Sequence, residues 1–212
     1  ETVNADIIVC DGDAPNIYRN LISEKHRAKW TNRKIDKLKY SMGLFVLYFG
    51  TKIKYDDIEH HTILFGKEFE SLLAKIFDKK ELSIDLSLYL HRPAATDSSM
   101  APSNRDAFYV LAPVPNADSN IDWTTKGDEI KNVILRRLES TLMPKLTHNI
   151  DVSFYVTPND FSKRFLTLNG SGFSLSPIFR QSAWFRFHNK SEDIANLFLC
   201  GAGTHPGAGV PG

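Results

Sequence analysis

The stretch GLFVLYFGTKI, residues 43–53, carries too many large apolar side chains for either face of a strand to lie in water. It is the strongest strand candidate in the chain. Two helical patterns follow it, and the second begins where Thr125 and Asp128 fit a capping box. Their predicted apolar faces are Phe69, Leu72, Leu73 and Ile76, then Ile130, Val133, Ile134 and Leu138. Further strand candidates are HTILFG, LSLYLHR, AFYVLAPVP and DVSFYVT. This order predicts an α+β region with a mixed, largely antiparallel sheet and flanking helices.

The two ends of the chain have a different character. ADIIVC (residues 5–10) and NLFLC (196–200) are short apolar runs that stop abruptly at Asp or Gly. Such runs are typical of buried parallel strands in a doubly wound sheet. Asp13 is predicted to cap a short helix from Pro15 to about residue 22. We therefore expect two terminal strands of one domain to enclose an inserted domain, with boundaries near 25–40 and 175–195.

The composition is that of an ordinary globular protein. Apolar residues make up 42% of the 212 positions, charged residues 24%, and the formal net charge is +1, which excludes disorder and a general attraction to nucleic acid. No apolar run is long enough to span a bilayer, and the start does not read as a signal peptide. With only Cys10 and Cys200, a reducing cytosol is the expected location. The chain lacks a starting Met and opens on a strand, so we expect a piece of a longer protein.

The carboxyl-terminal loop is unusually rich in glycine. GAGTHPGAGVPG, residues 201–212, holds five of the chain's 12 glycines. Glycine is costly to order and is retained where the backbone needs positive φ or must approach a ligand closely. Such a loop after a strand predicts backbone amides directed at phosphate or at a carbonyl-rich ring edge, the alternative being a flexible tail. It is not the G-x-G-x-x-G dinucleotide fingerprint, which would require a glycine at Pro206.

Residues 196–212, NLFLCGAGTHPGAGVPG, closely resemble the carboxyl-terminal flavin motif of the bacterial-type phytoene desaturases. GLFVLYFG, SLYLHRPAATDSSMAP, FYVLAPVPN, MPKL and QSAWFR resemble stretches of that family in the same order. The resemblance implies an amine-oxidase-like fold, in which FAD lies across a Rossmann-type domain and an inserted sheet domain covers the substrate. It implies removal of hydrogens from phytoene, diapophytoene or a related polyene, as a step in carotenoid biosynthesis.

The resemblance also implies site residues and a domain plan. The implied cofactor-binding residues are Gly201, Ala202, Gly203, Thr204, Pro206, Gly207, Gly209, Val210, Pro211 and Gly212. Residues 1–24 would belong to the FAD-binding domain, 25–195 to the substrate-binding domain with its connectors, and 196–212 to a truncated FAD motif. The family's G-x-G-x-x-G is absent, so this chain alone is expected to fold but not to hold FAD tightly. For the full-length protein we expect a hydrophobic polyene substrate, peripheral membrane contact, a possible oligomer and no nucleic acid.

Other candidate sites are weaker. Trp184 and Arg186 in QSAWFR line a flavin or polyene cavity by resemblance, the alternative being a packed aromatic with a surface Arg. His60 and His61 are adjacent, and neighbours on a strand point to opposite faces, so we expect no metal site. Asp97 is expected to form a turn rather than to act as a base. No catalytic residue can be named.

Two alternatives stay open. One is a carotenoid isomerase or retinoid saturase of the same fold. The other is a non-enzymatic domain that uses the basic segment from Lys25 to Lys39 on anionic membranes, although that segment also reads as a solvated connector.

Overall fold

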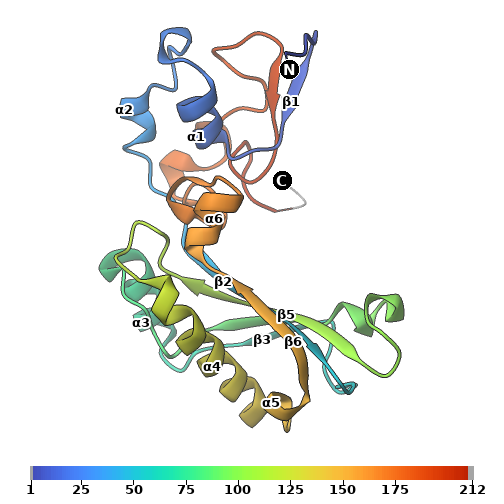
Figure 1. Cartoon of the computed structure of the whole chain (residues 1–212). Helices are drawn as coiled ribbons and strands as arrows, with labels where there is room; N and C mark the ends of the chain where they lie inside the picture. Colours follow the sequence, from blue (N-terminus) through green and yellow to red (C-terminus); the bar gives the residue numbers. More distant parts are fainter. Residues whose placement is uncertain (1, 210–212) are drawn as a thin grey trace. The chain divides into compact units, whose positions relative to one another are not determined.

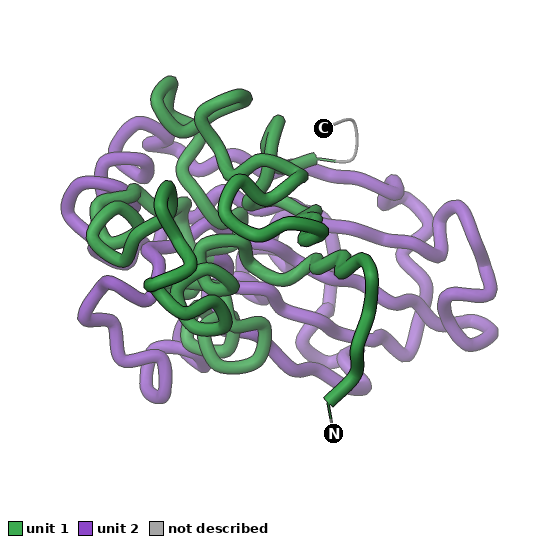
Figure 2. Tube along the Cα trace, turned by 90° about the horizontal axis from the view of Figure 1, so that it is seen from above, with its two compact units in different colours: residues 1–43, 158–212 green, residues 44–157 purple. Residues whose placement is uncertain are grey.

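The chain divides into two compact units in a computed structural model that describes residues 2–209. The second unit is a continuous stretch, Leu44–Thr157, and the first combines Glu1–Gly43 with Pro158–Gly212 (Figures 1 and 2). The first unit contains β1 (Ile8–Cys10), α1 (Ala14–Asn16), α2 (Asn32–Ile35), α6 (Pro158–Arg164) and β7 (Leu197–Leu199). The other elements are β2 (Gly43–Thr51), β3 (His61–Leu64), α3 (Phe69–Ala74), β4 (Leu88–His91), β5 (Asp106–Val114), α4 (Trp123–Thr141), α5 (Leu146–Asn149) and β6 (Ile150–Val156).

The second unit is built on a five-stranded sheet in the order β3-β4-β5-β2-β6. The pairs β3–β4, β4–β5 and β2–β6 are antiparallel. Helix α4 runs across one face of this sheet, as Figure 1 shows. The prediction of an α+β region with flanking helices and a largely antiparallel sheet is confirmed.

The core of the second unit lies between this sheet and α4. Along β2, Phe45, Leu47 and Phe49 are buried, and the helix contributes Ile130 and Ile134. Along β5 every second residue is buried. The buried face of α4 at Ile130, Ile134 and Leu138 confirms the predicted helical period, and β2 is buried at nearly every position, except that Tyr48 is exposed.

Two helix predictions need correction. Helix α4 begins at Trp123 and not after the capping box predicted at Thr125. Its cap is Asp122, whose carboxylate accepts the backbone N–H of Thr124 at 3.0 Å. In α3, Leu72 is buried, but Phe69 is 45% exposed, so the helix buries a narrower stripe than the pattern predicted. Leu73 is likewise 39% exposed, whereas Ile76 is buried in the π-helical turn Lys75–Lys79 that follows the helix.

The two terminal strands pair as predicted. β1 and β7 are parallel, with Val9 opposite Phe198. ADIIVC is not buried in this chain, because Ile8 and Val9 are 56% and 69% exposed, which confirms the exposed apolar surface expected near residues 5–10 when the chain is alone. These two strands form a sheet of their own among residues 2–209, so the outer edge of β1 has no neighbouring strand there.

The first unit has a separate core around aromatic residues from distant segments. Trp30 stacks on Phe187 with ring centroids 3.8 Å apart, and Tyr18 packs against both. Asp13 occupies the cap position of α1 but does not cap it with its side chain; its carboxylate instead accepts the hydroxyl of Ser174 at 2.6 Å. That helix is also shorter than predicted, because a π-helical turn replaces it over Ile17–Leu21.

The basic segment belongs to this core rather than forming an isolated connector. Lys34 lies over the ring of Trp30, 4.0 Å from its centroid, and Lys29 forms an ion pair with Glu192. Arg27 is buried and donates to the carbonyl of Trp30. Lys29, Lys34 and Arg27 therefore already have partners within the unit, and an anionic surface would have to compete with these contacts.

The chain passes between the units at residues 43–44 and 157–158, whereas 25–40 and 175–195 lie inside the first unit. The division into functional domains 1–24, 25–195 and 196–212 stays a prediction. Within the described part of the chain, no helix is both long enough and apolar enough to cross a membrane.

Candidate functional site

The first half of the glycine loop is a turn closed on itself. Thr204 donates both its backbone N–H (3.1 Å) and its hydroxyl (2.8 Å) to the carbonyl of Gly201, whose φ is +98°. A Cβ on Gly203 would lie 2.8 Å from the hydroxyl oxygen of Ser174, and Ala202 is partly buried. Gly203 and Thr204 are therefore packed within the unit, whereas Gly201 is exposed, and the cofactor role predicted for these four residues stays a prediction.

The second half of the loop borders a hollow. Pro206, Gly207 and Gly209 line a cavity of about 470 Å³ within the first unit, together with Arg186. Gly207 and Gly209 have φ of +147° and +122°, in the region that favours glycine. A Cβ on Gly207 would stand 3.3 Å from Nε of Arg186, so the backbone here is pressed against the guanidinium. The predicted residues Val210, Pro211 and Gly212 lie outside the described residues.

Arg186 is the most unusual charge in this unit. Its side chain is buried, and its two terminal nitrogens donate to the carbonyl of Leu175 at 3.3 and 3.1 Å. Nε is buried without a hydrogen-bond partner, and none of the described acidic side chains forms an ion pair with it. Burial lowers the pKa of Arg186. A buried cation with an unused donor suits an anionic or carbonyl-rich ligand.

Trp184 behaves differently from its neighbour in the sequence. It is 69% exposed and packs beside His188, with ring centroids 4.4 Å apart, outside the hollow that Arg186 lines. The interpretation of QSAWFR as a packed aromatic with a surface Arg is therefore wrong on both residues. The predicted substrate role of Trp184 and Arg186 stays a prediction.

The second unit has a candidate surface that the sequence did not indicate. On the sheet face opposite α4, a set of residues that we call the open aromatic face consists of Tyr48, Tyr89, His91, Tyr109 and Phe154. The register places Tyr48 opposite Phe154 and His91 opposite Tyr109, so these side chains share one face. Tyr48 stacks on Phe154 at 4.8 Å and packs on Tyr109 at 5.8 Å, which makes the row continuous across β4, β5, β2 and β6.

This face is both apolar and accessible. Phe154 is 57% and Val152 61% exposed, and both line a cavity of about 320 Å³ with Tyr48. The ion pair between Arg105 and Asp151 borders the same cavity. Desolvation and the neighbouring Tyr89 raise the pKa of Tyr109 to about 12, so its hydroxyl stays protonated. The signal that the sequence carried was an aromatic residue at an outward position of β2, β4, β5 and β6, where a solvated sheet places polar residues.

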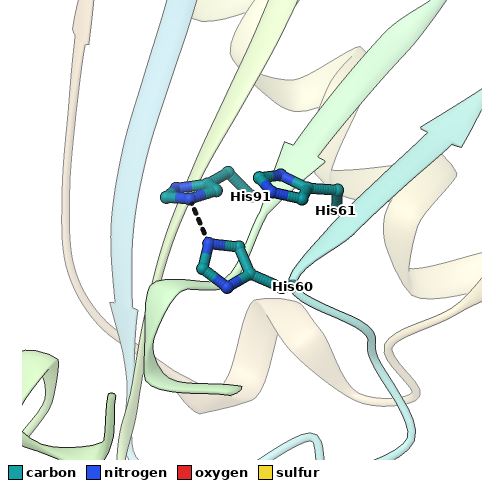
Figure 3. A group of neighbouring side chains, drawn as sticks. All are labelled: His60, His61 and His91. Atoms are coloured by element: carbon teal, nitrogen blue, oxygen red, sulfur yellow. Dashed lines mark hydrogen bonds between the residues drawn. The ribbon is translucent and has the colours of Figure 1, made fainter. Parts of the chain in front are cut away.

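The open aromatic face ends in three histidines. His60, His61 and His91 each offer a ring nitrogen within 4.8 Å of the others, as Figure 3 shows. The expectation that the first two rings point apart is wrong, because β3 begins at His61 and His60 lies before it, where strand alternation does not apply. Their ring centroids are 4.2 Å apart. Asp97 makes the predicted turn, with its carboxylate accepting the N–H of Ser99 at 2.9 Å.

The chain is similar along almost its whole length to several curated proteins. It is 45% identical to a phytoene desaturase (neurosporene-forming) of Rhodobacter capsulatus, over 98% of this chain and 40% of that protein. It is 43% identical to a phytoene desaturase (lycopene-forming) of Pantoea ananas, over 97% of this chain and 42% of that protein. A 4,4'-diapophytoene desaturase (4,4'-diaponeurosporene-forming) of Staphylococcus aureus is 36% identical, over 99% of this chain and 44% of its own.

A solved structure supports the fold. The crystal structure of an oxidoreductase from Methanosarcina mazei matches 95% of this chain and 39% of its own, with a TM-score of 0.51 at 10% identity. No protein-family model matches the chain. The chain spans about two fifths of the length of the curated relatives it matches. By its sequence similarity to these relatives, the chain belongs to the bacterial-type phytoene desaturase family.

Proposed function

We propose that the full-length protein is an FAD-dependent desaturase that removes hydrogens from phytoene, diapophytoene or a related polyene in carotenoid biosynthesis. The observation that carries this proposal is the 45% identity to a relative named as a phytoene desaturase, over 98% of this chain. This chain would supply the sheet on which the substrate lies and part of the flavin site.

The residues of the first unit fit part of FAD. The hollow beside Pro206 and Gly207 has backbone close to its surface, and Arg186 offers a buried donor without a counter-ion. Such a group suits the carbonyl edge of an isoalloxazine ring. Bound FAD supplies the hydride acceptor in a desaturation, while a proton leaves the neighbouring carbon of the substrate. The pyrophosphate requires a glycine turn at a helix N-terminus, and the sequence contains no G-x-G-x-x-G for it.

The open aromatic face fits a long polyene. Tyr48, Tyr109 and Phe154 present flat apolar surfaces in a row, and conjugated or allylic chains pack well on such rings. Burying them under a substrate also excludes water from the reacting carbons. The chain's contribution to the reaction is therefore to bind and align the substrate.

The test is expression of the full-length protein in cells that make phytoene, with analysis of the extracted products. Coloured polyenes with fewer hydrogens are expected, and phytoene that persists unchanged contradicts the proposal. An isomerised product with the same hydrogen count favours a carotenoid isomerase instead. Tyr48→Ala is expected to lower the product yield at unchanged protein level, while Phe179→Ala, at an 83% exposed position in the first unit, leaves it unchanged.

We further propose that the full-length protein works in the cytoplasm at the membrane surface, because its substrate dissolves in lipid rather than in water. In this chain Ile8 and Val9 of β1 are exposed apolar residues, so the chain alone is expected to pair with further strands or with a second copy. Sedimentation with lipid vesicles tests membrane contact, and light scattering tests the oligomer. Oligonucleotide binding that falls with salt would instead favour the basic segment as a nucleic-acid site.

A further inference from the structure

Three imidazole rings meet at the edge of the sheet in the second unit. His61 begins β3, His91 ends β4 directly opposite it, and His60 reaches them from the preceding loop (Figure 3). Nε2 of His60 lies 2.7 Å from Nε2 of His91. Rings of His61 and His91 stack with centroids 5.3 Å apart. A neutral imidazole ring has one N–H and one nitrogen lone pair. Three such rings side by side therefore place several lone pairs close together.

Hydrogen bonding alone does not satisfy this cluster. If His60 donates through Nε2, then His91 accepts through Nε2 and its Nδ1 carries the proton; the reverse donation leaves that Nδ1 bare. In both cases Nδ1 of His91 is buried without a partner.

The two outer rings are already oriented through their other nitrogens. Nδ1 of His60 bonds the hydroxyl of Thr96, and Nδ1 of His61 lies 2.7 Å from the hydroxyl of Tyr89. This leaves Nε2 of each ring for the centre of the cluster. Metal-binding histidines usually bond an oxygen through the nitrogen that does not ligate, which fixes the tautomer and the ring direction.

The loop that carries His60 is also held rigidly. Arg92 donates its backbone N–H to the carbonyl of His60 at 2.9 Å and its guanidinium to the carbonyl of Ile58 at 2.9 Å. Arg92 is itself buried and paired with Asp106. Ligands on such a framework are placed before a cation arrives, which lowers the cost of binding.

We propose that His60, His61 and His91 form a binding site for a divalent cation of borderline softness, for which Zn²⁺ is the representative. Neutral imidazole is a preferred ligand of Zn²⁺. Tetrahedral Zn²⁺ with N ligands at about 2.0–2.1 Å places those nitrogens roughly 3.3–3.4 Å apart. The present separations, from 2.7 Å to at most 4.8 Å, span that value, so small ring movements would admit the ion.

The fourth position of such a site would be accessible. His61 is exposed, and no carboxylate joins the three rings in the cluster among the described residues. Zinc sites with three protein ligands keep one position for water or another ligand, unlike closed four-ligand structural sites. The proposal does not depend on the desaturase activity, since it rests on these side chains alone.

The experiment is a Zn²⁺ titration of the purified chain without a histidine tag, followed by calorimetry and by the visible absorption of bound Co²⁺. Cys10 and Cys200 are free thiols in the first unit, so both are replaced by Ser in every sample to exclude thiolate binding. The variants are His91→Gln and His61→Gln. The matched control is His148→Gln, in α5 of the same unit and outside the cluster.

One Zn²⁺ per chain is expected, together with the Co²⁺ spectrum of a four-coordinate site. Loss of a group that only hydrogen-bonds a ligand typically weakens metal binding about 10–100-fold. Tyr89 bonds Nδ1 of His61 in this way, so Tyr89→Phe should weaken Zn²⁺ binding about 10-fold. Each ligand variant should weaken it by at least about 100-fold. His148→Gln should bind as the parent does. His61 is exposed, so its variant keeps the test valid even where His91→Gln fails to fold. Absence of saturable binding in the parent, or equal binding in parent and His61→Gln, would overturn the proposal.

Discussion

One buried carboxylate fixes the loop before β3, and its removal should be costly. Both oxygens of Asp106 lie 3.1 Å from Nε of Arg92, and one also accepts the N–H of Tyr55 at 2.8 Å. The side chain of Asp106 is fully buried and that of Arg92 is 6% exposed. The guanidinium goes on to bond the carbonyl of Ile58 and the carboxylate of Asp56, which is 78% exposed. Asp106 is therefore the only buried partner for this charge among the ion pairs of the described residues.

Asp106→Ala leaves the Arg92 cation and the Tyr55 N–H without their buried acceptor. Removing one partner of a buried ion pair costs about 3–5 kcal/mol of unfolding free energy, because the remaining charge is uncompensated. Domains of this size are stable by about 5–15 kcal/mol, so the second unit would lose a large share of its stability. The control is Asp118→Ala, which removes the exposed ion pair with Lys80 and should cost no more than about 1 kcal/mol.

Hydrogen exchange of the core amides in β2 and β5 measures the opening free energy of the second unit separately from the first. Asp106→Ala should accelerate exchange of these amides by about two to four orders of magnitude, since about 1.4 kcal/mol corresponds to a factor of ten in an opening equilibrium. Amides of the first unit should be unchanged. Equal and small effects of Asp106→Ala and Asp118→Ala would refute the reasoning, because the buried pair would then contribute no more than a surface pair.

Three other predictions follow from local geometry. Gly127→Ala, despite the better helix propensity of Ala, should lower the melting temperature, because its Cβ would lie 2.6 Å from ring atoms of Tyr155; a rise in melting temperature would contradict this. Gly207→Val in the full-length protein should reduce the flavin content of purified protein, because φ of +147° and a Cβ at 3.3 Å from Arg186 both disfavour a side chain; unchanged absorbance per chain would contradict this. The 212-residue chain alone should be colourless after dialysis, since it lacks the pyrophosphate motif, and a stoichiometric yellow preparation would contradict that.

The regular elements of the second unit could be predicted because each follows from a local pattern. The apolar run at residues 43–53 predicts a buried strand, and it forms β2. The buried helix face of Ile130, Ile134 and Leu138 likewise follows from its spacing. The limits of the helices were harder to predict from the sequence. Asp122 and Thr125 are both residue types that suit the cap of α4, and the helix begins after whichever of them accepts a backbone N–H.

The side chains of the sites were harder to predict, since their direction depends on tertiary structure. Trp184 and Arg186 are two residues apart, yet the aromatic ring is exposed and the cation is buried. Hydrophobicity predicts the opposite. The guanidinium donates to the carbonyl of Leu175, 11 residues earlier, and no local pattern predicts that contact. The histidine cluster was missed for a related reason, because it joins His91 to residues 30 positions earlier across a strand pair.

The two faces of the five-stranded sheet explain why this unit is built as it is. One face is buried by α4, which supplies the core and hence the stability. An antiparallel sheet normally turns polar residues toward water on its second face, yet here β6 presents Val152 and Phe154, and β2 presents Tyr48 beside them. The rings on this face contact one another but stay partly exposed, so they stabilise the fold of the unit less than the buried rings of the core do. We propose that this second face is a binding surface, and its rings suit an apolar ligand that is long enough to cross several strands. A polyene has that chemistry, in agreement with the substrate proposed for the full-length protein.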